Sequence, residues 1–498
     1  MAETAYEGLA GAWSDDGRSD DGRSDDGRSE DGGFEDGRSE DGGSEDGRSE
    51  DAAGVSAGAG GAPRRQPARE AAARTYARAL PVVPVRARGL TIEDAAGRRY
   101  LDCASGAGTL ALGHHHPVVL EAMRRVLDSE TPLQVMGLTT PVEDAFVTEL
   151  LRTLPPQLAD HARVRFCRPG GTDPVDTAVA LVRAATGRSP IVTPTGAHLG
   201  AAAEACCPSD AGEPPAGVVL EPVRSADGVL PVPDAWLRDL RRVTAERSVP
   251  LIADETETGV GRTGALWAVD HSGVTPDVLI LSKAIGGSLP LAAVVHHEDL
   301  DGRRTGSDRR AVGAPGAGTF RGNQLALAAG AATLAHVREQ RLAEHAAALG
   351  GRILSRLRGL AAEFASVGNV RGRGLMIGVE LVSPDGAPDG APSGGTRSDG
   401  IPCDSAPSDG NPSGGIPSGD GPPGTGSELA LAVQRECLRR GLIVALTGPD
   451  RNVVRLMPPL IITEEQASTI LDRFADAVQA VDRRRGGHAP PHRAHAAR

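Results

Sequence analysis

Between positions 164 and 296, short apolar runs of strand length alternate with segments of helix length. The strand-like runs are 164–167, 189–192, 218–222, 249–254, 278–281 and 289–296, with helical segments at 174–186 and 234–246. Such alternation predicts a mainly parallel central sheet with crossover helices on both faces, hence an α/β fold. A long helix over 323–364, a strand at 375–380, a helix at 428–440, a strand at 453–456 and a helix at 464–481 predict a small α+β domain after it.

Lys283 is the only lysine of this 498-residue chain, since the other 52 of its 53 Lys and Arg residues are arginine. Lysine, unlike arginine, can lose its proton near neutral pH and attack a carbonyl as a free amine. A lysine kept by chance is the alternative. Lys283 follows the apolar run 278–281, however, and strand ends of open α/β sheets are where active sites lie. We therefore predict that its amine is catalytic.

Two further features belong with this lysine. Asp254 ends the strand-like run 249–254, and one crossover segment separates this run from the run before Lys283. The ends of two neighbouring strands can therefore bring a carboxylate and an amine into one pocket. Gly170, Gly171 and Thr172 join a strand to a helix, and backbone N–H groups at a helix N-terminus bind phosphate. A pyridine cofactor needs these groups, because a carboxylate keeps its ring nitrogen protonated and makes the ring an electron sink. Together they indicate a site for pyridoxal 5'-phosphate (PLP).

Composition excludes several other classes. The pentapeptide repeats at 14–53 hold 16 acidic residues and 5 arginines, a net −11 of the chain's −13, so the acidity belongs to a tail and indicates no nucleic-acid partner. Six cysteines without metal spacing and no signal-peptide pattern favour the cytoplasm. No run is long enough to span a membrane. The triplet His114–His116 is not expected to bind metal, because adjacent residues cannot converge on one ion.

Several motifs resemble those of class III, fold type I, PLP-dependent aminotransferases. They are the stretches 254–264 (DETETGVGRTG), 276–283 (PDVLILSK), 318–323 (GTFRGN), 371–380 (RGRGLMIGVE) and 453–460 (VVRLMPPL). Within that class, the stretches 166–175, 106–110, 318–325 and 433–443 look like those of L-2,4-diaminobutyrate:2-oxoglutarate 4-aminotransferases. The resemblance covers about 80–481, apart from a low-complexity insert.

The resemblance implies a homodimer that moves the terminal amine of diaminobutyrate to 2-oxoglutarate, giving aspartate 4-semialdehyde and glutamate reversibly. It implies that Lys283 carries PLP and moves a proton, that Asp254 faces the ring nitrogen, and that Thr319 reaches the neighbouring subunit's phosphate. It further implies that Glu257 and His198 contact the cofactor. Arg455 is expected to bind a substrate carboxylate, for which a guanidinium is suited; a surface or interface ion pair is the alternative.

The predicted domain plan combines the resemblance with composition. It comprises a disordered acidic repeat tail at 1–63, an N-terminal segment of the small domain at 64–125, a large PLP-binding domain at 126–330, a C-terminal small domain at 331–485 with an insert at 383–427, and a disordered tail at 486–498.

The chain departs from the family pattern at four places. Glu257 stands where the family has glutamine, and Ala197–His198 replaces a Tyr-His pair. The glutamate that neutralises the carboxylate-binding arginine is Ala226 here, with Asp227 as a possible substitute. His198 and Glu221 are 23 positions apart, where the family has roughly fifty more residues, which would leave a sheet edge uncovered. These departures keep two alternatives open: another ω-aminotransferase using ornithine, acetylornithine or 4-aminobutyrate, and a catalytically impaired partner protein.

Overall fold

A computed structural model describes residues 80–135, 137–170, 172–194, 214–301, 322–383 and 425–485. The chain divides into two compact units, Met1–Val82 and Val83–Arg498, and every element named below belongs to the second. The predicted disordered segments 1–63 and 486–498 lie outside the described residues, as does the insert except for its two ends.

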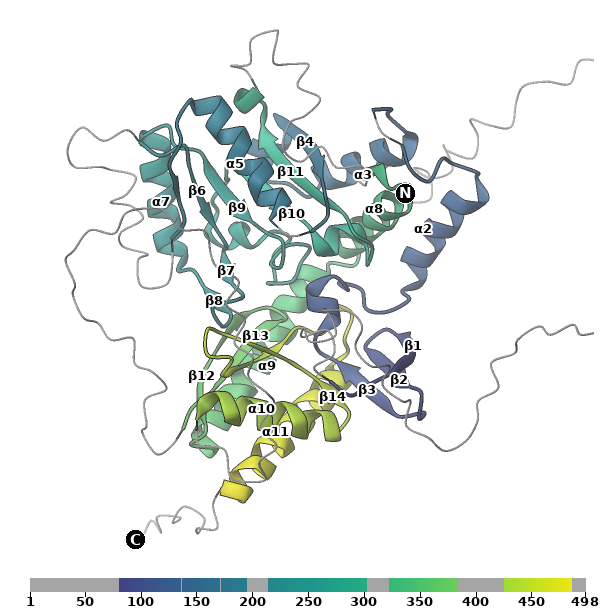
Figure 1. The fold of residues 1–498 in the computed structure, drawn as a ribbon, viewed down its shortest axis with the longest axis vertical. Helices are drawn as coiled ribbons and strands as arrows, with labels where there is room; N and C mark the ends of the chain where they lie inside the picture. Colours follow the sequence, from purple (N-terminus) through teal and green to yellow (C-terminus); the bar gives the residue numbers. More distant parts are fainter. Residues whose placement is uncertain are drawn as a thin grey trace, which may run out of the picture. The chain divides into compact units, whose positions relative to one another are not determined.

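Within the described residues, the central sheet has six strands in the order β4-β11-β10-β9-β6-β5. Figure 1 labels each of them except β5. Their bounds are β4 Ala162–Cys167, β11 Ala292–His297, β10 Val278–Leu281, β9 Leu251–Asp254, β6 Gly217–Leu220 and β5 Ile191–Val192. Strands β10, β9, β6 and β5 pair in parallel, whereas β11 runs antiparallel to both of its neighbours. The predicted mainly parallel sheet is therefore confirmed, with one reversed strand.

Alternate residues of these strands enter two separate cores, as the twofold period of a strand requires. On one face, residues such as Leu279 and Leu281 pack with side chains from helices α3 (Pro141–Leu151), α7 (Asp234–Glu246) and α8 (Gln324–Glu339). On the other face, strand residues pack against Ala178, Leu181 and Val182 of α5 (Asp173–Thr186). In Figure 1, α5 lies across β10 and β11. Helices thus cover both faces, as predicted.

Asp277 sets the register of β9 against β10 at the edge of the sheet where these strands begin. Its Oδ2 accepts the backbone N–H of Leu251 at 2.8 Å, while its own N–H donates to the Leu251 carbonyl at 2.9 Å. Arg241 of α7 holds the same carboxylate through two bonds of 2.6 and 3.1 Å. The resulting register pairs Ile280 with Asp254.

The other strands in the described part of the chain form three smaller sheets. Strands β1 (Pro84–Arg88), β2 (Thr91–Asp94) and β3 (Arg99–Asp102) form the predicted meander, and β14 (Leu442–Ile443) from the C-terminal part of the chain adds to it in parallel. A second sheet has the order β12-β13-β16-β15, and β7 pairs with β8. Their bounds are β12 Val367–Arg373, β13 Met376–Leu381, β16 Val453–Leu456, β15 Ala445–Thr447, β7 Val223–Arg224 and β8 Leu230–Pro231.

Several helices begin and end at the residues that their sequence signals indicate. Helix α2 (Pro117–Asp128) has Pro117 at its first position, and α5 ends at Gly187, which adopts a left-handed φ of 72°. The other helices are α4 Pro156–Ala159, α9 Leu342–Glu363, α10 Gly426–Arg439 and α11 Glu464–Arg485, with short 3-10 turns η3 Ser105–Gly108, η5 Ala268–Ser272, η6 Lys283–Gly286 and η7 Glu298–Asp301.

Two details differ from or refine the predictions. The continuous helix predicted over 323–364 is wrong, because Arg341 adopts a φ of 51° and separates α8 from α9. Within the described residues, the two-residue strand β5 is the last strand of the sheet, and it directly precedes the shortened region. No described helix is both long and apolar enough to cross a membrane.

Candidate active site

The predicted amine and carboxylate lie at the ends of adjacent parallel strands. Asp254 is the last residue of β9 and pairs in register with Ile280 of β10. Lys283 follows β10 by two residues and starts the turn η6 with a left-handed φ of 53°. That conformation is uncommon for a non-glycine residue, and the surrounding structure must offset its cost. The strand order therefore brings the two predicted groups to one edge of the sheet.

Lys283 and Arg455 share one carboxylate. The Lys283 amine donates to Oε1 of Glu257, and Nη1 of Arg455 donates to Oε2 of the same residue at 2.9 Å. Nη1 of Arg455 also donates to the Ser225 hydroxyl at 2.7 Å. Arg455 comes from β16, so this network joins the central sheet to a second sheet.

The charges of this network change the pKa values of its acids. Burial acts to raise the pKa of Glu257, but the charges of Arg455 and Lys283 and their hydrogen bonds lower it below its ordinary range. Burial raises the pKa of Asp254, and the nearby Glu257 carboxylate adds to that rise, whereas hydrogen bonds from Thr256 and the charge of Lys283 oppose it. Glu257 is consequently held as an anion between two cations.

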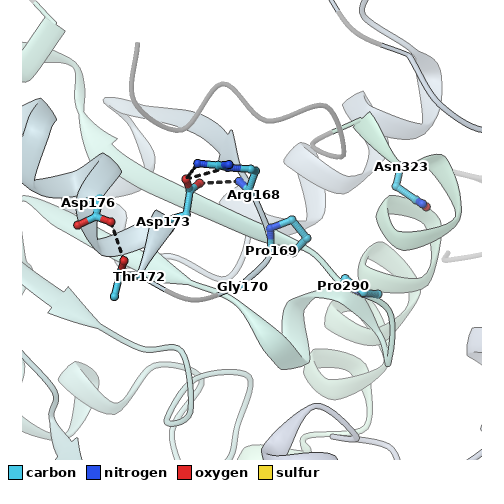
Figure 2. A pocket seen from close by; sticks show the side chains of 8 residues that line it. All are labelled: Arg168, Pro169, Gly170, Thr172, Asp173, Asp176, Pro290 and Asn323. Carbon is cyan, nitrogen blue, oxygen red and sulfur yellow. Dashed lines mark hydrogen bonds and ion pairs between the residues drawn. The ribbon is translucent and has the colours of Figure 1, made fainter. Parts of the chain in front are cut away.

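The predicted phosphate loop borders a pocket of about 560 Å³ (Figure 2). Gly170 and Thr172 line it with Pro290 and Asn323, which lie on the far side of the pocket from α5. Thr172 is the N-cap of α5, and its hydroxyl donates to Asp176 at 2.7 Å. The carboxylates of Asp173 and Asp176 also line the pocket, so the groups there that favour an anion are the free N–H groups and the positive dipole end at the N-terminus of α5.

The loop that carries this pocket is held by an ion pair. Arg168 donates to Asp173 through its backbone N–H at 2.8 Å, through Nε at 3.0 Å and through Nη2 at 2.8 Å (Figure 2). The pocket is at the same sheet edge as Lys283, because Cys167 ends β4 opposite Ala292, the first residue of β11. Two strand spacings, roughly 10 Å, separate β4 from β10.

A strained loop of the N-terminal segment flanks the Arg455 strand. Ser105, Gly106 and Ala107 have consecutive φ values of 46°, 58° and 56°. Asp102 holds this loop, since its carboxylate accepts the Ser105 N–H at 3.0 Å and contacts His114 Nε2 at 2.9 Å. Next to it, the carbonyl of Cys103 accepts the backbone N–H of residue 457, which follows β16, at 2.8 Å.

The structure thus brings four predicted residues together and leaves others untested. Lys283, Asp254, Glu257 and Arg455 gather at one edge, and Gly170 and Thr172 line the pocket there. Three further predicted residues, Gly171, His198 and Thr319, lie outside the described residues.

Sequence reasoning missed Ser225, and the possible substitute Asp227 has another partner. Asp227 pairs with Arg224 at 3.0 Å, so the carboxylate that faces Arg455 is Glu257 instead. Ser225 is 230 positions from Arg455, and no spacing in the sequence signals their contact. Within the described residues, no cluster of three or more His, Cys, Asp or Glu side chains could hold a metal ion.

Comparison with known proteins gives consistent results. A family model described as "Aminotransferase class-III" matches residues 71–213 and 207–478. The chain is 39% identical to the diaminobutyrate--2-oxoglutarate aminotransferase of Rhizobium meliloti over 84% of this chain and 93% of that protein. It is 32% identical to the protein of the same name from Haemophilus influenzae over 83% and 94%, respectively. It is also 30% identical to the acetylornithine aminotransferase of Methanosarcina acetivorans over 81% and 93%.

Solved structures share the fold. An amine transaminase from an uncultivated Pseudomonas species, solved in its PLP-bound form, has a TM-score of 0.62 at 24% identity and covers 80% of this chain and 95% of its own. An acetylornithine aminotransferase from Elizabethkingia anophelis has a TM-score of 0.64 at 23% identity, with 80% and 94% covered. The two segments matched by the family model overlap at 207–213, within the shortened region between His198 and Glu221.

Proposed function

The chain belongs to the class-III aminotransferases, which are PLP-dependent enzymes, and we propose that it transfers the terminal amine of L-2,4-diaminobutyrate to 2-oxoglutarate. The observation that carries the choice of substrate is the 39% identity to a diaminobutyrate--2-oxoglutarate aminotransferase over 84% of the chain. The transfer exchanges an amine for a carbonyl oxygen, so the products are aspartate 4-semialdehyde and glutamate and the reaction is reversible.

The described residues fit the cofactor. An amine and a half-buried carboxylate stand at adjacent strand ends, and a pocket at the same edge meets the N-terminus of α5. Lys283 would hold PLP covalently, Asp254 would keep its ring nitrogen protonated, and Gly170, Gly171 and Thr172 would bind its phosphate. His198 and Thr319 complete the proposed contacts.

PLP, when bound, supplies a carbonyl that condenses with amines and a ring that withdraws electrons from the adjacent carbon. Lys283 would also be the base that moves a proton of the substrate, because its Nζ is the amine that follows the end of β10. Arg455 orients the substrate by binding the carboxylate of the substrate. Asp254 contributes a fixed negative charge that Thr256 holds in place by a hydrogen bond of 2.9 Å.

Assembly and location follow from the same proposal. We expect a homodimer in the cytoplasm, with the large and small domains divided as predicted near residue 330. Three exposed leucines support a subunit interface: Leu127 of α2 is 53% exposed, and Leu133 and Leu138, between α2 and α3, are 48% and 69% exposed. Light scattering of the purified protein would give twice the mass of the chain; a monomer would contradict this expectation.

Incubation with PLP tests the enzyme assignment. The wild-type protein should acquire the visible absorption of the bound cofactor and form glutamate from diaminobutyrate and 2-oxoglutarate. Lys283→Ala and Lys283→Arg should both lose the absorption and the activity, because a guanidinium keeps the charge but cannot condense with a carbonyl. Ser225→Ala, which removes a hydroxyl without touching the amine, is the matched control and should retain the absorption.

The same assay separates the alternatives. Glutamate formation from acetylornithine, ornithine or 4-aminobutyrate, but not from diaminobutyrate, would indicate another ω-aminotransferase. This alternative is supported by the 30% identity to an acetylornithine aminotransferase. A wild-type protein that stays colourless after incubation with PLP would refute the enzyme assignment and favour an impaired partner protein.

A further inference from the structure

The pocket at the N-terminus of α5 contains negative charge. Asp173 and Asp176 line it, and both lie in the first turn of the helix. A phosphate monoester carries about two negative charges near pH 7, so these carboxylates oppose its binding. A pocket that receives a phosphate must therefore contain groups that offset this repulsion.

The start of α5 offers an anion fewer donors than a helix N-terminus usually does. Pro174, in the first turn, has no backbone N–H. The N–H of Gly170 already donates to the carbonyl of Arg168 at 3.0 Å, and the Thr172 hydroxyl donates to Asp176 at 2.7 Å. The helix dipole and the remaining N–H groups thus need a further positive group to hold a phosphate beside two carboxylates.

Arg168 is the one cation among the described residues that line the pocket. Its backbone N–H donates to Oδ2 of Asp173 at 2.8 Å, and its Nε and Nη2 donate to Oδ1 at 3.0 and 2.8 Å (Figure 2). Both oxygens of Asp173 are therefore occupied by Arg168. This pairing cancels the charge of one of the two carboxylates in the pocket.

The guanidinium of Arg168 has donors left for a second anion. The Arg168 side chain is 64% exposed, whereas the Asp173 side chain beneath it is 11% exposed. Nε and Nη2 are bound to Asp173, which leaves the N–H groups of Nη1 without a partner within the described part of the chain. A guanidinium suits a phosphate because its planar set of donors matches two phosphate oxygens at once.

We propose that Arg168 completes the phosphate site of the cofactor. It neutralises Asp173 and donates its remaining N–H groups to the phosphate oxygens, so that the pocket selects a phosphate monoester over the same molecule without phosphate. The inference rests on the proposed function for naming PLP as the molecule that carries this phosphate. The chemistry of the pocket itself is that of a phosphate site.

The test compares PLP with pyridoxal, which has the same aldehyde but no phosphate. Both can condense with Lys283, and the visible absorption of the full chain during titration gives a dissociation constant for each. Arg168→Gln should weaken PLP binding at least about tenfold, the size expected for loss of one hydrogen bond between charged groups, and should leave pyridoxal binding unchanged. An unchanged ratio of the two constants would overturn the proposal.

Two further variants assign the effect. Arg183→Gln is the matched control, because it removes one arginine from the last turn of the same helix, where Nε of Arg183 donates to the carbonyl of Ser189 at 2.8 Å. It should keep the wild-type ratio, and a loss as large as that of Arg168→Gln would reduce the effect to general charge. Adding Asp173→Asn to Arg168→Gln should recover part of the lost PLP affinity, because the carboxylate left unpaired is removed. No recovery would contradict neutralisation, and full recovery would contradict direct donation.

A failure of the proposed function gives a different result. If neither aldehyde produces visible absorption with the wild-type chain, the enzyme assignment has failed. Arg168 is then tested with inorganic phosphate, whose binding to the cofactor-free chain titration calorimetry measures. Wild type should bind phosphate and Arg168→Gln should bind it more weakly; equal affinities, or no binding by wild type, would refute a phosphate site at Arg168.

Discussion

Glu255, between Asp254 and Glu257, offers a stability test of the segment that carries the site acids. Its side chain is 2% exposed, and its carboxylate accepts the Thr258 hydroxyl and the backbone N–H of Val269, the latter at 2.9 Å. Burial raises the pKa of Glu255 from 4.5 to about 7, and these hydrogen bonds offset only part of the rise. The folded protein therefore keeps a proton on Glu255 at a pH where the unfolded chain has lost it.

The sign and size of the effect follow from linkage. Glu255 contributes stability that is fully present below pH 4.5 and is lost as the pH rises through about 7. Between about pH 5 and about pH 8 the free energy of unfolding should fall by about 2.5 kcal/mol on account of this one group. Glu255→Gln stays neutral throughout and keeps an acceptor oxygen for Val269. Relative to wild type, the variant should thus gain about 2.5 kcal/mol across that interval.

Urea unfolding of the cofactor-loaded protein, followed by circular dichroism at several pH values, measures this gain. Glu246→Gln is the matched control, because Glu246 is 59% exposed in α7 and pairs with Arg242 at 3.1 Å. Its difference from wild type should stay nearly constant with pH. A constant difference for Glu255→Gln, or one that runs in the opposite direction, would refute the argument that a buried charge at this position destabilises the fold.

Two further predictions concern packing and thiols. Gly259→Ala should lower the free energy of unfolding by about 1–3 kcal/mol, because its Cβ would lie 2.6 Å from the buried ring of Trp267. Gly351→Ala in α9, whose added Cβ would meet nothing within 4 Å, should raise it by about 0.5–1 kcal/mol in the same urea unfolding experiment. Equal shifts for the two variants would contradict this. The described cysteines are free and buried, namely Cys103, Cys167 and Cys437. Burial raises the pKa of the last two to about 12, so peptide mass spectrometry should find them unmodified by a thiol reagent near pH 8 until urea unfolds the chain.

The positions of Lys283 and Asp254 were predictable because local patterns determine them. Each follows an apolar run of strand length, and the crossover between them makes the strands adjacent and parallel, as the pairing of Ile280 with Asp254 confirms. Strand ends in such a sheet meet at one edge, so chemistry and topology could be inferred together. The same reasoning identified β10 and α7 with the bounds that the structure has.

The network around Glu257 was not predictable, because it depends on packing between distant segments. Arg455 contacts Glu257 across 198 positions and Ser225 across 230. Asp227 was a possible substitute for the neutralising glutamate because of its place in the sequence, but Arg224, three residues away, pairs with that carboxylate. Strand β12 was missed for a local reason, since its glycines weaken the strand pattern, and its pairing with β13 supplies what propensity does not.

Asp277 lies at the end of the sheet where β9 and β10 begin, and it affects the positions of the site residues at the opposite end. Its carboxylate and N–H fix Leu251 at the start of β9, three residues and about 10 Å before Asp254. A slip of one residue between β9 and β10 would turn every side chain of one strand to the opposite face, carrying the carboxylate away from the amine. The alignment of the carboxylate with the amine thus depends on the ion pair between Asp277 and Arg241, which contacts neither group.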